Sequence, residues 1–529
     1  MAGRPKLLLF SHLSGSDVMT GAEKLFLLFI RELAAHFDCS LVVPQEGALA
    51  RQARGAGIGT LEMDLPLSLA LFSALPEVDA EVGALPAHPA WEPLVFLLLR
   101  ESPDYVWTNT TVHPMPAMAA KALGIPTVWS VMETMRQTPY RPQAAAIVSL
   151  YSDLIVGISD SVLEPYRAAD MSGKTAVLRP YVELLAHAPE RLPEIRARQR
   201  ARLGLQDHSF AAGFVAATIY PNKGLLEFVH AMLPLMRQHP DVRALIVGKP
   251  VDEAYVQSVR ELIWRQDLSA RFVWMEFREN IEEIYAPMDA VVVPSIVPEG
   301  FGMTALEGMM FGKPVIAFAS GGLREILERA EAGAWLAQTG HVQGLTERLH
   351  MLLSDPALRL SVGAHNARMA AERFSVRQFR EALGHWLRRL PPPASQQPAA
   401  PLPDIPQEGL VRGGGGTVYL IQHGRKRPFG SPKALRDHGY RFEDVRAVSD
   451  LVLDLIPDGE ALLESAPARR ARRRIVRRRS RRRGRARIRV ARGTRRIRRG
   501  RIRASRRSNG KRGAGRRRRS ASVRKRKGR

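Results

Sequence analysis

Residues 298–307 read PEGFGMTALE, and this stretch decides the fold predicted for the chain. It follows an apolar run at 290–294, AVVVP, which predicts a buried parallel strand. A helical pattern then continues to Phe311. A strand, a glycine-rich loop and a helix in this order bring free backbone N–H groups and a helix N-terminus together, which favours a bound phosphate. Glu299 and Glu307 flank the loop, and their carboxylates can accept hydrogen bonds from sugar hydroxyls.

Two further motifs lie downstream of this stretch. GKPVIA occupies 312–317 and GGLRE occupies 321–325. Together with the E-x7-E spacing of the first stretch, they resemble the donor half of the retaining glycosyltransferases of glycosyltransferase family 4. The resemblance covers about residues 5–390 and is strongest in 210–330. It implies an α/β protein of the GT-B fold, in which two Rossmann-like domains face each other across a cleft, and a nucleotide-sugar donor.

The resemblance also implies roles for the residues of the loop. Glu299 is expected to contact the hydroxyls of the donor sugar, and Glu307 the ribose of the nucleotide. The plain alternatives are a surface acid for Glu299 and, for Glu307, a carboxylate that is favourable at a helix start without any ligand. The residues expected to bind the rest of the donor lie between them: Gly300, Phe301, Gly302, Met303 and Thr304.

Lys223 is the candidate for the departing diphosphate. It lies in a PNKG turn between a predicted strand and a predicted helix, where its ammonium could neutralise the charge that builds on the leaving group. The family usually has an arginine five residues earlier, and this chain has Thr218 there. Arg179, Lys249 or Arg278 could replace it. Taken by itself, the turn would indicate only a solvated surface lysine.

The N-terminal part predicts a first Rossmann-like unit. A strand at 6–10 and a loop at 11–20 precede a helix that begins at Gly21 and ends near residue 35. The loop resembles the family's glycine loop, so Gly21 is expected near the donor phosphates. It lacks the G-x-G-x-x-G spacing, so nothing indicates NAD, and no cofactor is expected.

Val131-Met132-Glu133 aligns with a place where the family often has His-Asp or His-Glu. Met132 stands where the histidine is expected, so Glu133, taken as the third catalytic residue, or His113 could serve the acceptor instead. The alternative for either residue is a polar side chain at the end of a strand.

Alternating strand and helix patterns predict open parallel sheets with helices on both faces. Further strands are expected at 41–44, 104–108, 126–130 and 153–159, and a second α/β unit is expected to begin near 176–178. The predicted domains are an acceptor domain at 1–180 with a helix at 373–390 packed back on it, a donor domain at 181–372, a proline-rich linker at 391–409, a small accessory module at 410–466 and a disordered tail at 467–529.

The tail carries the net charge of +27. Of the 79 Lys and Arg residues, 34 lie in 469–529 without a single acid, which leaves 45 against 52 acidic residues elsewhere. Such a segment could bind anionic lipid or nucleic acid without sequence preference. The alternative is an extension of arginine-rich composition without a selected role. The module at 410–466 resembles a small repeat that is appended to some bacterial cell-surface and polysaccharide-related proteins, and the resemblance implies no function for it.

A single cysteine, Cys39, excludes an internal disulfide and fits a reducing compartment. No run reaches the ~18 apolar residues of a membrane helix. We therefore expect a cytoplasmic protein, or one peripheral at the inner face of the membrane. No D-x-D pair lies at a strand end, so we expect no divalent metal.

The sequence therefore predicts a hexosyltransferase that moves a sugar from a nucleotide diphosphate sugar to a glycan or glycolipid acceptor, with retention at the anomeric carbon, in synthesis of polysaccharide, glycolipid or cell-envelope glycan. A rival hypothesis is a catalytically silent scaffold that displays the basic tail, which Met132 and Thr218 favour. A second rival is a sugar phosphorylase or epimerase of the same fold. The oligomeric state is left open.

Overall fold

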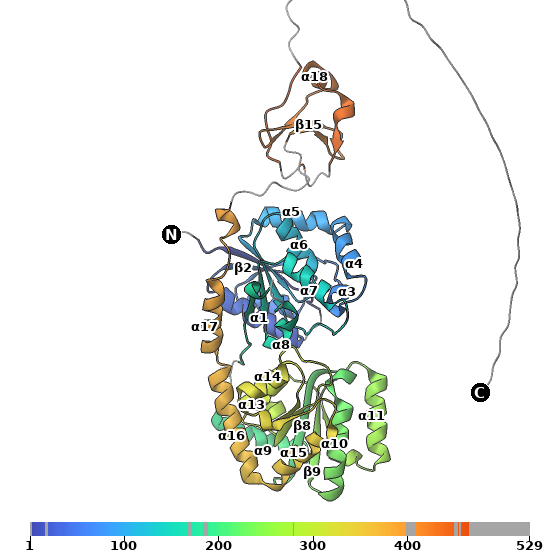
Figure 1. Cartoon of the computed structure of the whole chain (residues 1–529), viewed down its shortest axis with the longest axis vertical. Coiled ribbons are helices and arrows are strands. Elements are labelled where there is room, and N and C mark those ends of the chain that lie inside the picture. The colour runs from blue at the N-terminus through green and yellow to red at the C-terminus, as the bar shows by residue number, and fades with distance from the viewer. Residues whose placement is uncertain are drawn as a thin grey trace, which may run out of the picture. The chain divides into compact units, whose positions relative to one another are not determined.

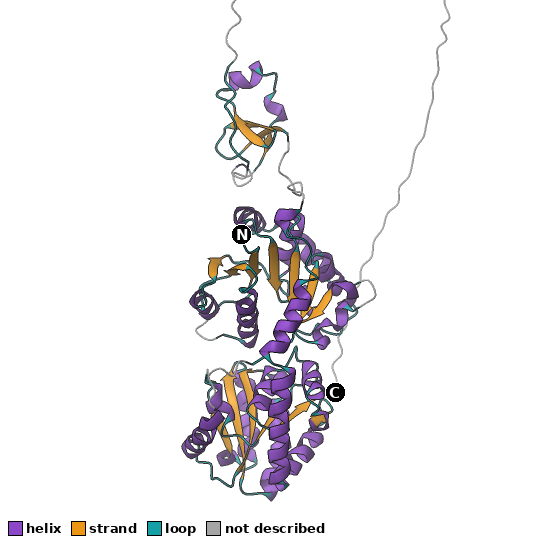
Figure 2. Cartoon of the chain, turned by 90° about the vertical axis from the view of Figure 1, so that its left-hand side faces the viewer, coloured by secondary structure: helices purple, strands orange, loops and turns teal. Residues whose placement is uncertain are grey.

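The computed structural model describes most of the chain before the basic tail. In that part, two larger sheets each lie between layers of helices, and a small sheet forms a separate module (Figures 1 and 2). The predictions for the tail and for residues 398–407 of the linker fall outside the described residues. The described residues are 3–15, 19–167, 171–182, 189–278, 280–397, 408–448, 453 and 456–464.

The first sheet is parallel throughout its described strands. Its central strands are buried along their length, which explains their near-continuous apolar sequences. β2 and β3 lie on one side of β1, and β4 and the strands after it lie on the other side, so the strand order changes direction between β1 and β4. Ligands of such sheets bind beside this switch point. The strand order is β3 (Gly59–Glu62), β2 (Asp38–Val43), β1 (Lys6–Phe10), β4 (Tyr105–Asn109), β5 (Thr127–Val131), β6 (Leu154–Gly157) and β7 (Thr175–Val177).

The prediction that a second unit begins near 176–178 is wrong. Thr175–Val177 pairs with β6 and forms an edge of the first sheet. A three-residue strand carries too little pattern to show which sheet it joins. The helices that cover the first sheet are α1 (Gly21–Leu33), α2 (Ala48–Gly55), α3 (Leu69–Ser73), α4 (Val78–Ala84), α5 (Trp91–Glu101), α6 (Pro114–Ala122), α7 (Arg141–Leu150) and α8 (Asp160–Leu163).

The second sheet is also parallel, and the strand that precedes the PEGFGMTALE stretch lies in its interior. Ala290–Val293 is β11, fully buried between two neighbours, as the sequence predicts. The order is β10 (Phe272–Met275), β9 (Val242–Pro250), β8 (Phe210–Ile219), β11, β12 (Val315–Phe318) and β13 (Leu336–Ala337). Its helices are α9 (Leu192–Arg202), α10 (Leu225–Gln238), α11 (Glu253–Arg265), α12 (Ile281–Tyr285), α13 (Met303–Met310), α14 (Gly322–Arg329), α15 (Val342–Ser354) and α16 (Pro356–Arg373).

Helix α17 (Val376–Leu387) leaves the second domain and packs on the first. Ser375 caps it by accepting a hydrogen bond from the backbone N–H of Gln378. On its buried face, Trp386 packs on Trp107 of β4 with ring centroids 5.3 Å apart. The aromatic cluster also includes a contact of Phe379 with Phe29 of α1, at 5.3 Å. Part of the core of the first domain is therefore supplied by a helix that follows the second domain in the sequence.

The small module has a sheet of mixed direction. Its strands follow the order β16 (Arg425–Pro428), β15 (Val418–Gln422), β14 (Gly409–Arg412) and β17 (Arg446–Ala447). β14 and β17 pair in parallel, whereas β15 is antiparallel to both of its neighbours. Ser431 caps the short helix α18 (Pro432–Asp437). The module has its own small apolar core, centred on Leu420, Phe429 and Leu435.

Helices long and apolar enough to cross a membrane were sought in the described part of the chain. No single helix qualifies there, although Val78–Ala87 and Trp91–Glu101, bent by 67° at their junction, do so as a pair by length and composition.

We expect Trp386→Ala to destabilise the first domain, because the substitution removes a side chain that is 2% exposed and packs on Trp107. The expected loss is about 3–5 kcal/mol of unfolding free energy, measured by urea denaturation. Arg377→Ala, an exposed position on the same helix, is the control and should change stability by less than about 0.5 kcal/mol. Equal stability of the two variants would show that α17 is not part of this core.

Candidate functional site

A cleft of about 1440 Å³ lies between the two larger domains. Every residue predicted for the site lines it except Glu307. The first domain contributes Gly21 and Glu133, and the second contributes the remainder. The predicted residues in its wall are Gly21, Glu133, Lys223, Glu299, Gly300, Phe301, Gly302, Met303 and Thr304.

The donor loop, residues 294–302 between β11 and α13, needs glycine at two positions for different reasons. At Gly302 the backbone has φ of +115°, which side-chain-bearing residues rarely adopt. At Gly300 the constraint is space, because a Cβ atom would lie 2.0 Å from the carbonyl oxygen of Met132. The loop therefore approaches the first domain as closely as a backbone can.

Two helix N-termini open into the cleft. Gly302, Met303 and Thr304 line it at the start of α13, and Gly21 lines it at the start of α1. At α1, Thr20 and Glu23 form a capping box, so that helix start is fixed. Free N–H groups and the positive ends of both helix dipoles therefore face the cleft, which suits an anionic group.

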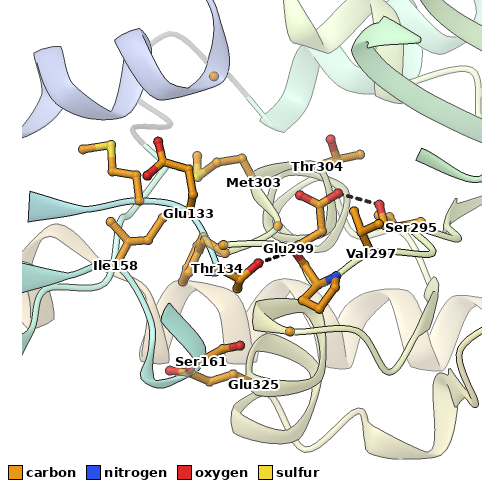
Figure 3. Close-up of a pocket in the computed structure, with 18 of the residues that line it drawn as sticks. Glu133, Thr134, Ile158, Ser161, Ser295, Val297, Glu299, Met303, Thr304 and Glu325 are labelled. Atoms are coloured by element: carbon orange, nitrogen blue, oxygen red, sulfur yellow. Dashed lines mark hydrogen bonds between the residues drawn. The ribbon is translucent and has the colours of Figure 1, made fainter. Parts of the chain in front are cut away.

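Glu299 is held by two donors. Ser295 Oγ donates to its Oε1 at 2.5 Å (Figure 3). Lys223 Nζ lies 2.8 Å from the same oxygen. Lys223 ends a short 3₁₀ turn, Pro221–Lys223, just before α10. The ion pair is partly exposed, with 34% of the lysine and 18% of the glutamate side chain accessible. Both groups are thus free to exchange this contact for a ligand in the cleft.

Glu307 lies apart from the residues predicted to act with it. It is in the second turn of α13, so the interpretation of Glu307 as a carboxylate at the helix start is wrong. Tyr285 Oη donates to its Oε2 at 2.7 Å. Burial raises the pKa of Glu307 above its usual range, while the Tyr285 bond and the charge of Lys24 oppose the rise. Lys24 belongs to α1, and its Nζ lies 5.1 Å from the ring centre of Phe277 in the second domain.

Glu133 lies at the end of β5 and faces the cleft (Figure 3). Burial raises the pKa of its carboxyl group to about 7, although hydrogen bonds with Thr111 favour the ionised form. Its Oε2 is buried and has no hydrogen-bond partner among the described residues. Glu133 is therefore a carboxyl group poised to exchange a proton near neutral pH.

His113, the alternative to Glu133, does not reach the cleft wall. It is 2% exposed at the start of α6, with its ring against Phe10. Burial lowers the pKa of His113 to about 3, with a smaller contribution from His12, so the ring is neutral. His113 is thus part of the core of the first domain.

None of the three bases named as substitutes at the Thr218 position lines the cleft. Arg179 bonds Glu325 and Asp160, and Arg278 bonds Glu283 at 2.7 Å. Arginines from three separate segments line it instead, a set that sequence reasoning missed because no local motif joins them. These are Arg136, Arg141, Arg167, Arg324 and Arg329.

A metal site would need several His, Cys, Asp or Glu side chains close together. No group of three or more that could hold a metal ion occurs among the residues that the structure describes.

Residues 196–369 match the family model described as "Glycosyl transferases group 1". The D-inositol 3-phosphate glycosyltransferase of Kineococcus radiotolerans is 35% identical over 215 residues, which cover 37% of this chain and 48% of that protein. The lipopolysaccharide core biosynthesis mannosyltransferase LpcC of Rhizobium leguminosarum bv. viciae is 29% identical over 164 residues, 31% of this chain and 46% of that protein. The chain thus spans about half the length of these curated relatives.

Solved structures match over both larger domains. Anabaena HepE, in complex with UDP and glucose, superposes with a TM-score of 0.61 at 20% identity, over 73% of this chain and 100% of its own. Sucrose-phosphate synthase from Thermosynechococcus elongatus gives a TM-score of 0.56 at 18% identity, over 73% and 99%. Likeness at this identity shows the fold alone. Residues 196–369 are therefore similar to the group 1 glycosyl transferases, and the two larger domains have the GT-B fold.

Proposed function

We propose that this chain transfers a sugar from a nucleotide diphosphate sugar to an acceptor hydroxyl, with retention at the anomeric carbon. The observation that carries the proposal is the meeting of Lys223 and Glu299 at the start of α13, inside the cleft. The group 1 glycosyl transferase match and the names of the relatives support it. The name of LpcC, a lipopolysaccharide core mannosyltransferase, supports an acceptor in glycolipid or cell-envelope glycan synthesis, whereas the name of the other relative indicates D-inositol 3-phosphate.

The proposed chemistry divides the charges of the transition state between the two groups. The N–H groups at the start of α13 and the ammonium of Lys223 hold the departing diphosphate. The carboxylate of Glu299 accepts hydrogen bonds from the donor sugar, whose ring becomes positively charged as the bond breaks. Glu133 binds the acceptor hydroxyl from the first domain. Lys223 and the amides supply the positive charge that a divalent metal would otherwise bring, so the reaction needs no metal.

The proposed site of action is the cytoplasm or the inner face of the membrane, where nucleotide sugars and lipid acceptors meet. The 34 basic residues of 469–529 would then hold the enzyme at anionic lipid by non-specific, salt-sensitive attraction. Nucleic acid is the other polyanion that this tail could bind.

The function is tested by nucleotide binding followed by turnover. UDP, GDP and ADP, with their sugars, are screened for an increase in melting temperature. A nucleotide at 100 times its Kd should add about 2.7 kcal/mol of stability. The sugar of the stabilising nucleotide should then be transferred with retention, as read by NMR of the product anomer. Stabilisation without turnover of any donor would favour the silent scaffold, and a phosphorolysis or epimer product would favour the second rival.

The two glutamates of the E-x7-E pair should differ in kinetics. Glu299→Gln should lower kcat by about 10²-fold, because its charge gains value as positive charge develops on the sugar. If Glu307 contacts the ribose, as the resemblance implies, Glu307→Gln should mainly raise the KM for the donor, since the ribose does not change during the reaction. If it serves only the contact with Tyr285, the KM should stay unchanged. Glu261→Gln, at an exposed position on α11, is the control and should change neither. Unchanged kinetics in both E-x7-E variants would contradict the donor-site assignment.

Glu133 should make stability depend on pH. Its pKa rises from 4.5 to about 7 on folding, so the native state keeps a proton that the unfolded state releases. That contribution is complete below about pH 4.5 and is lost as pH rises through 7. Relative to Glu133→Gln, the wild type should therefore lose on the order of 3 kcal/mol between pH 4 and pH 8. The unfolding free energies of both proteins are measured by denaturant titration across this pH range. If they change with pH in the same way, Glu133 is not buried.

A further inference from the structure

Two hydroxyl groups of the first domain hold the backbone of the donor loop. Thr134 Oγ1 donates to the carbonyl of Pro298 at 2.8 Å (Figure 3). Ser159 Oγ donates to the carbonyl of Gly300 at 2.6 Å. Both acceptors are main-chain atoms on either side of Glu299. The position of this catalytic candidate relative to the first domain is therefore set by the backbone of the loop.

Helix α14 supports the same loop from behind. The backbone N–H of Gly322 donates to the carbonyl of Glu299 at 2.8 Å, so the start of α14 and the loop are joined directly. One turn further on, Glu325 reaches the first domain. Its Oε2 accepts from the backbone N–H of Asp160 at 2.7 Å, and its Oε1 accepts from Nε of Arg179 at 2.5 Å.

The contact between Glu325 and Arg179 is partly buried, and Arg179 shares it with Asp160. The side chains of Glu325 and Arg179 are 13% and 21% exposed. Arg179 also bonds the carboxylate of Asp160, a residue of the first domain whose backbone N–H bonds Glu325. A partly buried, doubly bonded carboxylate is held far more firmly than an isolated surface ion pair.

The chain crosses between the two larger domains twice. Each crossing segment contacts either Glu325 or the donor loop. Arg179 lies just after β7, the last strand of the first sheet, on the first crossing. Phe374 lies between α16 and α17, on the second crossing, and its buried ring packs edge-on against Phe301 of the donor loop, with centroids 5.9 Å apart. A change in the angle between the domains must therefore move the donor loop.

We infer that Glu325 is a positioning residue for the transfer reaction proposed above, on which this inference rests. Through Asp160 and Arg179 it fixes the donor loop at the separation from the first domain at which an acceptor hydroxyl reaches the anomeric carbon. In transfer, the acceptor oxygen bonds the anomeric carbon, the bond to the diphosphate breaks, and the hydroxyl proton leaves with a phosphate oxygen. When the separation loosens, water takes the place of the acceptor and the same bonds change, which gives free sugar.

The carboxylate cannot be replaced by an amide without loss. Both oxygens of Glu325 accept hydrogen bonds, one from a backbone N–H and one from a guanidinium. Glutamine offers one acceptor and one donor, so Glu325→Gln keeps the shape of the side chain but must break one of the two contacts. Glu325 also lines the cleft, so the KM for the donor shows whether its side chain contacts the donor directly.

The test measures how each variant divides the donor between transfer and hydrolysis. With saturating acceptor, free sugar and glycosylated product are quantified together for wild type and Glu325→Gln, using the donor found by the nucleotide screen. Glu325→Gln should raise the hydrolysed share several-fold and lower kcat for transfer by up to about 10²-fold, with the KM for the donor within about 2-fold. Glu331→Gln is the control: Glu331 pairs with Arg373 at an exposed site of the second domain, and the substitution should leave the partition unchanged.

A second pair of variants separates positioning from a loss of structure. Arg179→Gln should shift the partition in the same direction, and the double variant should lose less than the product of the two single losses, because they remove one shared contact. An unchanged partition in Glu325→Gln would overturn the inference while leaving the transferase function intact. A parallel loss of transfer, hydrolysis and melting temperature would show a structural role and overturn it as well. A wild type that turns over no donor would overturn the proposed function, and the inference with it.

Discussion

The arrangement of the cleft depends on the close approach of two backbones. The Cα of Gly300 lies so near the carbonyl of Met132 that a Cβ atom would come within 2.0 Å of that oxygen. Because no side chain separates the two segments, the hydroxyls of Thr134 and Ser159 can bond the loop carbonyls directly. Groups from both domains then line one cleft, with Glu133 on one side and the pair of Lys223 and Glu299 on the other.

The parts of the fold that the sequence predicts well are those whose signal is local. Helix α10 (Leu225–Gln238) begins directly after the PNKG turn, where the sequence predicts a helix, and Gly224 takes a left-handed conformation immediately before it. The strand, loop and helix around 290–310 follow for the same reason, since the buried apolar run and the glycines are adjacent in sequence. The glycines and acidic residues of the donor loop therefore predict a ligand site from the sequence alone.

The parts that the sequence does not predict depend on contacts between distant residues. Glu325 and Arg179 are 146 positions apart, so nothing near either residue indicates their bond. Glu307 is close in sequence to Glu299, yet its bond to Tyr285 and its place in the second turn of α13 separate it from the cleft wall. The prediction that the second unit begins near 176–178 is wrong because Thr175–Val177, a strand of three half-buried residues, carries too little pattern to show which sheet it joins.

The return of α17 to the first domain also governs how the chain can fold during its synthesis. The aromatic face formed by Phe29 and Trp107 is covered by Phe379 and Trp386, which leave the ribosome only after the whole second domain has been made. Domains usually fold in order from the N-terminus, but here the first domain must wait with an apolar surface uncovered. The second domain can complete its own sheet in the meantime. A nascent chain of this architecture is thus exposed to chaperones and proteases at its N-terminal half, and a ribosome that stalls before residue 376 releases a domain that cannot close its core.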